Sequence, residues 1–153
     1  MQELDDPLRL DRQVCFALAV AHRSVLAVYR PLLEPLGLTH PQYLVMLALW
    51  GEAPMSVKAV AEAIQLDSAT LSPLLKRLES AGLITRRRDP HDERTLHIDL
   101  TEMGRDLREQ AEQIPPAVVA RLGVSLADLE ELRDVLGRVN AAARRAGDVR
   151  ERS

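Results

Sequence analysis

Positions spaced alternately by three and four residues form one mainly apolar stripe between residues 8 and 29, the pattern of a single long helix. We expect Pro31 and Pro35 to end this helix, because proline inside a helix removes a backbone hydrogen bond. A helix of this length with one apolar side needs a surface to pack against. The stripe consists of Leu8, Asp11, Cys15, Leu18, His22, Val25 and Tyr29.

The C-terminal region, residues 102–147, repeats the helical pattern. Thr101 is placed to cap a helix that Pro115 and Pro116 interrupt, and Ser125 opens the last helix, which we expect to fray in the alanine–arginine run at 141–145. We interpret residues 8–36 and 102–147 as dimerisation helices, although packing within one chain would also cover their stripes. The last stripe comprises Leu126, Leu129, Leu132, Leu136 and Val139.

Residues 39–101 predict a compact module between these helices. Thr39 caps a helix from Pro41 to about residue 50, and Ser56 caps a short helix over 57–64. After a three-residue turn, Asp67 or Ser68 caps a further helix that runs to residue 81. Gly82 is the expected left-handed stop. Two short helices joined by such a turn form a helix-turn-helix.

A β-hairpin is expected directly after these helices. Residues 83–88 have strand character, residues 89–92 form a turn, and apolar and polar residues alternate over 95–100. A hairpin at this place is a wing. We therefore predict a mainly α fold with a small β-hairpin wing: one chain, residues 1–153, in which a winged helix-turn-helix carries N- and C-terminal dimerisation helices.

The charge distribution is compatible with a DNA-binding protein although the net charge is −3. Between residues 54 and 88, six basic side chains stand against three acidic ones, while acidic residues concentrate in 102–131. The second helix of the motif is expected to place short side chains at base edges and basic ones near phosphates. The candidate DNA-binding residues are Ser68, Ala69, Thr70, Ser72, Lys76, Arg77, Arg86, Arg87, Arg88, Asp92 and Arg94.

The wing strengthens this interpretation, because an arginine near a hairpin tip can enter the minor groove. Arg94 has this position, and Asp92 is placed to hold its guanidinium by a bidentate pair. A solvated charged loop would explain the same residues, and so would a winged helix that binds a partner without contacting DNA bases.

Other classes of protein find little support in the sequence. One cysteine excludes an internal disulfide and favours a reducing cytoplasm, and the acidic N-terminus is no signal peptide. No apolar run approaches the roughly 18–20 residues that span a bilayer, so no membrane partner is expected. The histidines show no metal-ligand spacing with Cys15, and no cofactor motif is present. A thiol peroxidase is the main enzymatic rival, but nothing resembles a peroxidase site.

Two segments resemble the MarR family of bacterial regulators. Residues 66–79 look like its recognition helix, Pro73 included, and Asp92-Glu93-Arg94 followed by Leu100-Thr101 resembles its wing signature. The resemblance runs from about residue 10 to 138. It implies a homodimer that binds pseudo-palindromic double-stranded operator DNA as a repressor.

Three further stretches, 10–16, 29–33 and 38–43, resemble the organic-hydroperoxide regulators of that family. The resemblance implies that Cys15 reacts with an organic hydroperoxide and that Tyr29 hydrogen-bonds the sulfur. With a single cysteine in the chain, the oxidised sulfur would be resolved by a low-molecular-weight thiol or be overoxidised. Tyr29 lies about 21 Å from Cys15 along one helix, so the contact would cross between subunits.

This chain departs from that branch at two positions. His40 stands where a second tyrosine is usual, and Ala19 where an aromatic residue is common. We expect the His40 imidazole to take over the hydrogen bond and, when protonated, to favour the thiolate. Phe16, Met46 and Trp50 are weaker candidates for an apolar recess that receives the peroxide. The alternative is a MarR-type repressor that binds a small phenolic-like ligand, with Cys15 as a structural residue.

Overall fold

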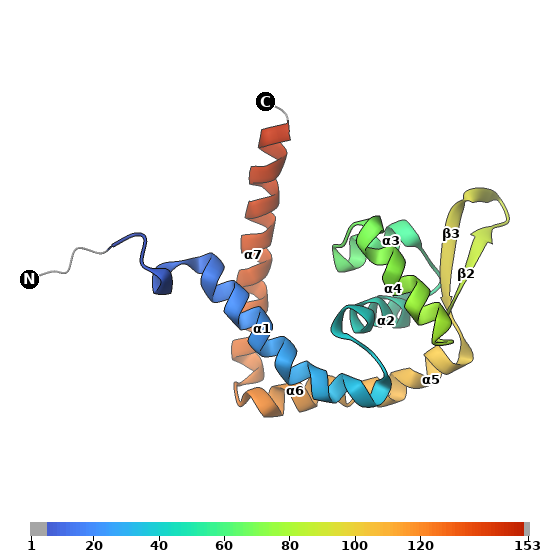
Figure 1. The fold of residues 1–153 in the computed structure, drawn as a ribbon, viewed down its shortest axis with the longest axis horizontal. Helices are drawn as coiled ribbons and strands as arrows, with labels where there is room; N and C mark the ends of the chain where they lie inside the picture. Colours follow the sequence, from blue (N-terminus) through green and yellow to red (C-terminus); the bar gives the residue numbers. More distant parts are fainter. Residues whose placement is uncertain (1–5, 152–153) are drawn as a thin grey trace, which may run out of the picture. The chain divides into compact units, whose positions relative to one another are not determined.

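The computed structural model describes residues 6–151 of the 153-residue chain. It separates into two compact units, Met1–Ile114 and Pro115–Ser153. Both are built mainly from helices, and the first also contains a small antiparallel sheet (Figure 1). This agrees with the predicted mainly α fold with a winged helix-turn-helix.

The N-terminal helical region is shorter at its start and longer at its end than predicted. It begins with the 3₁₀ turn η1 (Leu10–Arg12), and α1 runs over Val14–Leu33 with Pro31 inside it. The expected end before Pro31 was wrong, because this proline removes only the N–H that would bond to the Ala27 carbonyl. The side chain of Leu33, 1% exposed, anchors the last turn in the core. Val14–Leu36 is long and apolar enough to cross a membrane, judged by length and composition alone. Core helices of soluble proteins and signal sequences share these properties.

Capping residues set the boundaries of the central helices. After η2 (Glu34–Leu36), α2 (His40–Glu52) begins at a capping box in which Thr39 and Gln42 bond reciprocally. Ser56 caps α3 (Val57–Ile64), as predicted. Asp67, the first of the two predicted alternatives, caps α4 (Ser68–Ser80), and Gly82 follows with a φ of 79°. These helices enclose a core that includes Val45, Met46, Leu49, Val60, Leu71, Leu75 and Leu78.

The wing belongs to a three-stranded sheet rather than a two-stranded hairpin. Its order is β1 (Met55–Ser56), β3 (Asp92–Leu100), β2 (Ile84–Asp89), all antiparallel. The sequence did not predict β1, whose two residues pair with Ile98 and His97 in the middle of β3. This third strand ties the base of the wing to the loop that precedes α3.

A small cluster of hydrogen bonds joins the wing to α5 (Glu102–Ala111). Thr101 caps α5 as predicted, and its hydroxyl donates to the Gly82 carbonyl at 2.6 Å. The Thr101 N–H donates to the Leu83 carbonyl at 3.1 Å. From α2, the indole N–H of Trp50 donates to the Gly104 carbonyl at 2.9 Å. We call these five residues the α5 joint.

The helices at the C-terminal end differ from the prediction in two details. Pro115 and Pro116 follow the first residue of α6 (Ile114–Leu122), where proline is tolerated because first-turn N–H groups have no partner in the helix. Ser125 caps α7 (Leu126–Glu151), and the run at 141–145 is helical rather than frayed. α7 exposes large apolar side chains, namely Leu126, Leu132, Val135, Leu136 and Val139.

Candidate nucleic-acid interface and cysteine site

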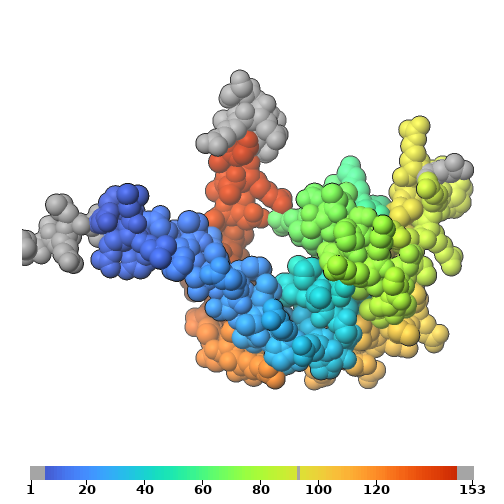
Figure 2. All heavy atoms as spheres, viewed as in Figure 1, coloured from blue at the N-terminus to red at the C-terminus, as the bar shows by residue number. Residues whose placement is uncertain are grey.

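The helix α4 has two chemically different sides. Its leucines at 71, 74, 75 and 78 are buried in the core of the first unit. Between them the helix exposes short polar and basic side chains, and it is continuous through Pro73. In the space-filling view, α4 (green) and the hairpin (yellow) lie at the surface (Figure 2). The exposed residues include every α4 candidate from the sequence, namely Ser68, Ala69, Thr70, Ser72, Lys76 and Arg77.

Asp67 organises the exposed start of α4. Its carboxylate accepts the Thr70 N–H at 2.7 Å and the Thr70 hydroxyl at 3.0 Å. Chiefly the bond from the Thr70 N–H holds the pKa of Asp67 below its usual value. The Thr70 hydroxyl therefore has a fixed direction, and its oxygen keeps lone pairs that can accept a hydrogen bond.

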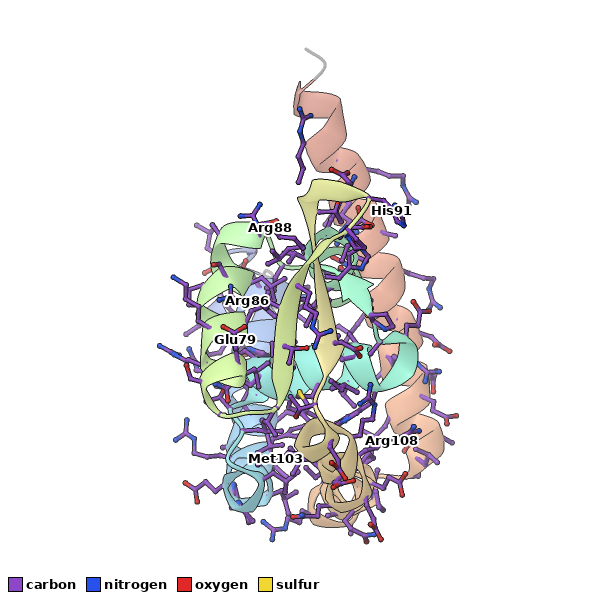
Figure 3. The ribbon with its side chains drawn as sticks, turned by 90° about the vertical axis from the view of Figure 1, so that its right-hand side faces the viewer. Glu79, Arg86, Arg88, His91, Met103 and Arg108 are labelled. Carbon is purple, nitrogen blue, oxygen red and sulfur yellow. The ribbon has the colours of Figure 1, made fainter. Side chains whose placement is uncertain are left out.

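The three consecutive arginines of β2 do not form one patch. Because strand side chains alternate, Arg86 and Arg88 share the face of Ile84, whereas Arg87 points to the opposite face. The Arg86 guanidinium pairs with Glu79 of α4 through bonds of 3.0 and 3.2 Å (Figure 3). This pair lowers the pKa of Glu79 through the hydrogen bond and raises that of Arg86 for the same reason. Arg86 thus braces the wing against α4, a role that the sequence did not suggest.

The turn of the wing is organised by two aspartates. Asp89 accepts the His91 N–H at 2.8 Å and contacts the His97 imidazole at 3.2 Å. These bonds, the one from His91 first, lower the pKa of Asp89. Asp92 accepts the backbone N–H of Arg94 at 3.1 Å and the Thr95 hydroxyl at 3.0 Å.

The expected bidentate pair between Asp92 and the Arg94 guanidinium was therefore wrong. A short aspartate side chain reaches the backbone N–H two residues ahead more readily than it reaches the guanidinium at the end of the arginine side chain. The carboxylate still positions Arg94, but through its backbone. The Arg94 side chain is exposed on β3, next to the turn of the wing.

Cys15 lies in the first turn of α1 and is exposed in the single chain. Tyr29, 14 residues further along the same helix, packs at the other end against His40 of α2. Their ring centroids are 5.1 Å apart, at an interplanar angle of 70°. The structure thus brings Tyr29 and His40 together. Within one chain, Tyr29 is remote from Cys15 because the two residues lie near opposite ends of α1.

Tyr43 is a third member of this cluster, which sequence reasoning missed. Its ring lies 6.1 Å from that of Tyr29 and 6.3 Å from that of His40, and its side chain is buried. Burial, and then the neighbouring Tyr29, raise the pKa of Tyr43. The spacing of three between residues 40 and 43 on a helix was the available signal. We call Tyr29, His40 and Tyr43 the aromatic cluster.

The surroundings of His40 affect the pKa of its imidazole. Burial, and then the nearby His22, hold the pKa of His40 below 6.5. A neutral imidazole is therefore the main form at neutral pH, and it can exchange hydrogen bonds but supplies no positive charge. That a protonated His40 favours the thiolate stays a prediction, and the lowered pKa makes the protonated imidazole the minor form at neutral pH.

The three residues expected to line a peroxide recess have separate roles. Met46 is fully buried in the core, and the indole N–H of Trp50 bonds to the Gly104 carbonyl within the α5 joint. Phe16 is 39% exposed on α1, close to Cys15 in sequence. Within residues 6–151, no cluster of three or more His, Cys, Asp or Glu side chains could hold a metal ion.

A short capped helix, a tight turn and a second helix with an exposed polar side, followed by a β-wing, define a winged helix-turn-helix. The family model of the transcriptional regulators SarA and Rot matches residues 27–111. The chain belongs to this MarR/SarA type of DNA-binding transcriptional regulators.

Individual relatives agree with this assignment, and they are regulators rather than enzymes. The organic hydroperoxide resistance transcriptional regulator of Bacillus subtilis is 43% identical over 136 residues, 89% of this chain and 92% of the relative. Reduced AbfR bound to DNA has a TM-score of 0.78 and 32% identity over 95% of this chain and 98% of its own. CouR of Rhodococcus jostii, bound to p-coumaroyl-CoA, has a TM-score of 0.72 and 30% identity, covering 86% and 94%.

Proposed function

We propose that this regulator is a homodimeric repressor that binds operator DNA through α4 and the wing and releases it when an organic hydroperoxide oxidises Cys15. The observation that carries the proposal is the exposed Cys15 in a chain 43% identical to an organic hydroperoxide resistance regulator. The low-molecular-weight thiol, the pseudo-palindromic operator and the cytoplasmic location are parts of the same proposal.

The DNA contacts follow from the exposed side of α4. Ser68, Ala69, Thr70 and Ser72 are short enough to let this helix approach base edges in the major groove. Lys76 and Arg77, further along α4, are suited to phosphates. Arg94 would reach into the minor groove beside the turn of the wing.

Dimerisation is supported by apolar surface on both terminal regions. In α1 the side chains of Val14, Phe16 and Leu18 are exposed, and α7 exposes five large apolar residues. Surfaces of this kind on a monomer are costly in water and are typical of subunit interfaces. A dimer would place two copies of α4 at successive major grooves, which explains a two-fold operator.

The redox step begins at the Cys15 sulfur. The thiolate attacks the peroxide O–O bond, the S–O bond forms as the O–O bond breaks, and the leaving alkoxide takes a proton to become an alcohol. A small thiol then condenses with the sulfenic acid, giving a mixed disulfide and water. Cys15 is exposed in the first turn of α1, so a peroxide can reach its sulfur in the single chain.

The aromatic cluster is the proposed partner of this sulfur in the dimer. Residues 15 and 29 are separated by about 21 Å along α1, so Tyr29 would hydrogen-bond the cysteine of the other subunit. The neutral His40 packs edge-on against Tyr29 and orients it. Adding bulk to the oxidised sulfur would displace Tyr29 and with it the start of α2.

The experiment is a DNA-binding assay with the region upstream of the chain's own gene, with and without cumene hydroperoxide and a small thiol. We expect the wild type to bind and to be released by the oxidant, and Cys15→Ser to bind and stay bound. Arg94→Ala should weaken binding by about 1–3 kcal/mol. Arg108→Ala, an exposed arginine of α5 paired only loosely with Glu112 at 3.8 Å, is the matched control.

Two results would contradict the proposal in different parts. If Cys15→Ser is released as readily as the wild type, the cysteine is not the sensor. If Arg94→Ala and Arg108→Ala bind DNA equally well, the wing does not read the groove.

A second candidate is a repressor controlled by a small ligand, with Cys15 structural. It is favoured by the likeness to CouR, which was solved with p-coumaroyl-CoA, and by the neutral His40 in place of the expected tyrosine. In this case Cys15→Ser would keep its response to the inducing compound, and cumene hydroperoxide would release neither protein.

A further inference from the structure

The hydroxyl groups at the exposed start of α4 differ in how they are held. Ser68, Thr70 and Ser72 are all exposed. The Thr70 hydroxyl bonds to the Asp67 carboxylate at 3.0 Å, whereas the side chains of Ser68 and Ser72 form no hydrogen bond with a residue that the structure describes. A serine hydroxyl without a partner rotates and can both donate and accept. The direction of the Thr70 hydroxyl is instead set by the protein.

The Asp67 carboxylate determines which of the two partners donates. The pKa of Asp67 is held below its usual value, chiefly by the bond from the Thr70 N–H, so this carboxyl is ionised at neutral pH. An ionised carboxylate only accepts hydrogen bonds. The hydroxyl hydrogen of Thr70 therefore points to Asp67, and the Thr70 N–H, 2.7 Å from the other carboxylate oxygen, holds the pair in place. Towards its surroundings Thr70 presents only the lone pairs of its oxygen.

An oxygen that can only accept distinguishes between bases in the major groove. Each base pair carries one amino donor there, N6 of adenine or N4 of cytosine. Guanine presents the acceptors O6 and N7, and thymine presents the acceptor O4 and a methyl group. Phosphate oxygens are acceptors as well. Such an oxygen thus finds a hydrogen-bond partner on adenine or cytosine, and none on guanine, on thymine or on the phosphates.

We propose that Thr70 is a specificity-determining residue that accepts a hydrogen bond from the amino group of an adenine or a cytosine in each operator half-site. Asp67 is its positioning residue, because it engages the hydroxyl hydrogen. The proposal rests on the proposed contact of α4 with the major groove.

The place of Thr70 on α4 suits this role. It is the third residue of the helix, and the N-terminal residues of a recognition helix are those that reach base edges. It also shares one exposed stripe with Pro73 and Arg77, at spacings of three and four residues. Arg77 is the residue that the proposed function assigns to a phosphate, so both ends of this stripe would face DNA.

The experiment is a selection of bound DNA by the full-length protein from random double-stranded sequences. Sequencing of the bound fraction gives the preference at each position, and binding constants are then measured for single-base substitutions of the best sequence. We expect one position in each half-site at which adenine and cytosine on the same strand bind about fivefold more tightly than guanine and thymine. This is the effect of one neutral hydrogen bond.

Two substitutions of Thr70 isolate its hydroxyl. Thr70→Val keeps the shape of the side chain without the oxygen and should bind all four bases at that position equally. Thr70→Ser keeps the hydroxyl and should keep the preference for adenine and cytosine.

Asp67→Asn should reverse the preference. The amide oxygen of the asparagine can still accept the N–H of Thr70 and cap α4, while its NH₂ group donates to the hydroxyl oxygen. The hydroxyl hydrogen is then available to an acceptor, so guanine and thymine should bind more tightly than adenine and cytosine.

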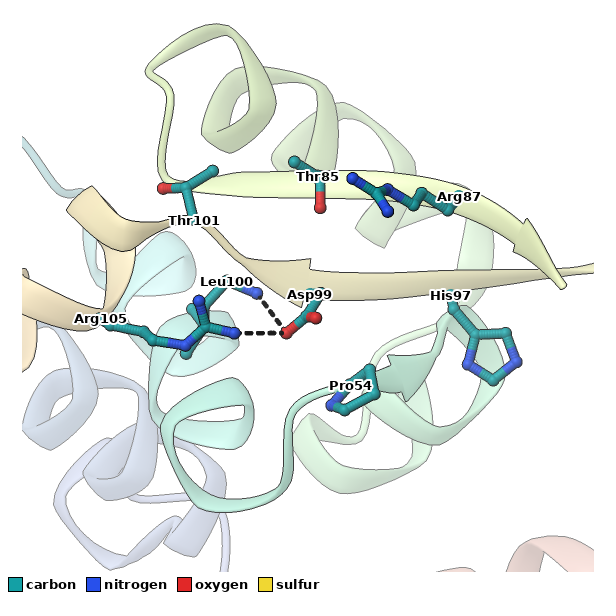
Figure 4. A pocket seen from close by; sticks show the side chains of 8 residues that line it. All are labelled: Pro54, Thr85, Arg87, His97, Asp99, Leu100, Thr101 and Arg105. Carbon is teal, nitrogen blue, oxygen red and sulfur yellow. Dashed lines mark hydrogen bonds and ion pairs between the residues drawn. The ribbon is translucent and has the colours of Figure 1, made fainter.

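Thr85→Val is the matched control, because it makes the same change on the face of the sheet that is turned away from α4. Thr85 and Arg87 alternate with Arg86, which pairs with α4. Thr85 lines a polar pocket at the base of the wing (Figure 4). This variant should select the same sequences as the wild type.

The proposal is overturned if Thr70→Val keeps the wild-type preference, since another group would then read that position. It is also overturned if Thr70→Val weakens binding to all sequences equally, as the loss of a phosphate contact would, or if Asp67→Asn still prefers adenine and cytosine. In these cases the wild type still selects a sequence, and the proposed contact of α4 with DNA stands. A wild type that selects no sequence would refute that contact and this proposal together.

Discussion

A methyl group on Gly104 is expected to destabilise this protein by about 2 kcal/mol. The Cβ of an alanine there would overlap the carbonyl oxygen of Leu83. That oxygen is a backbone atom and accepts the Thr101 N–H, so it cannot rotate away. Overpacking at such a contact costs about 3 kcal/mol, the upper end of its usual range. Alanine is about 1 kcal/mol more favourable than glycine in a helix, so the expected net destabilisation is about 2 kcal/mol.

The assay is urea unfolding followed by the fluorescence of Trp50, the single tryptophan of the chain. One protein concentration is used throughout, because the stability of a dimer depends on it. Gly137→Ala in α7 is the matched control: its Cβ meets no atom within 4 Å. It should therefore raise stability by about 1 kcal/mol. If Gly104→Ala is as stable as the wild type while Gly137→Ala gains stability, the close approach of α5 to the wing is refuted.

Three further predictions concern single side chains. Trp50→Phe removes the indole N–H that bonds to the Gly104 carbonyl and should cost about 1 kcal/mol in thermal unfolding followed by circular dichroism; an unchanged stability would contradict this. Asp67 has a lowered pKa in the folded state, so its stabilisation is present at neutral pH and is lost as the pH falls below its usual value of 3.8. The stability of Asp67→Asn should depend less on pH in that range, and parallel curves would refute the cap. The pKa of His40 is also lowered in the folded state, below 6.5, but here the charged form is the protonated one. The unfolded chain therefore binds the proton more tightly, and stability falls as the pH drops below 6.5. His40→Gln should lose less stability than the wild type between about pH 7.5 and about pH 5.5, and an equal loss would show that another group titrates.

The helix-turn-helix was predictable because its boundaries depend on local chemistry. Ser56 and Asp67 each accept an N–H from three residues ahead, and this bond requires no distant partner. Gly82 adopts the left-handed conformation that ends the turn after α4. Signals of this kind lie within a few residues of the element that they delimit.

What the sequence did not reveal depends on contacts between distant segments. Strand β1 has two residues and exists because the middle of β3 lies beside it. The Arg86–Glu79 pair requires the twist of the wing relative to α4, which no spacing reports. The alternation of β2, by contrast, was readable, and the run of three arginines should have been divided between two faces from the start.

The α5 joint and the aromatic cluster are connected by one element, α2. His40 is its first residue and packs against Tyr29, while Trp50, ten residues later and about 15 Å along the helix, bonds to Gly104. The same helix thus contacts the aromatic cluster at its start and the α5 joint near its end. The joint also holds the last residues before β2 and the cap of α5. The aromatic cluster and the base of the wing are therefore connected by α2 and by one side-chain hydrogen bond, from Trp50 to Gly104.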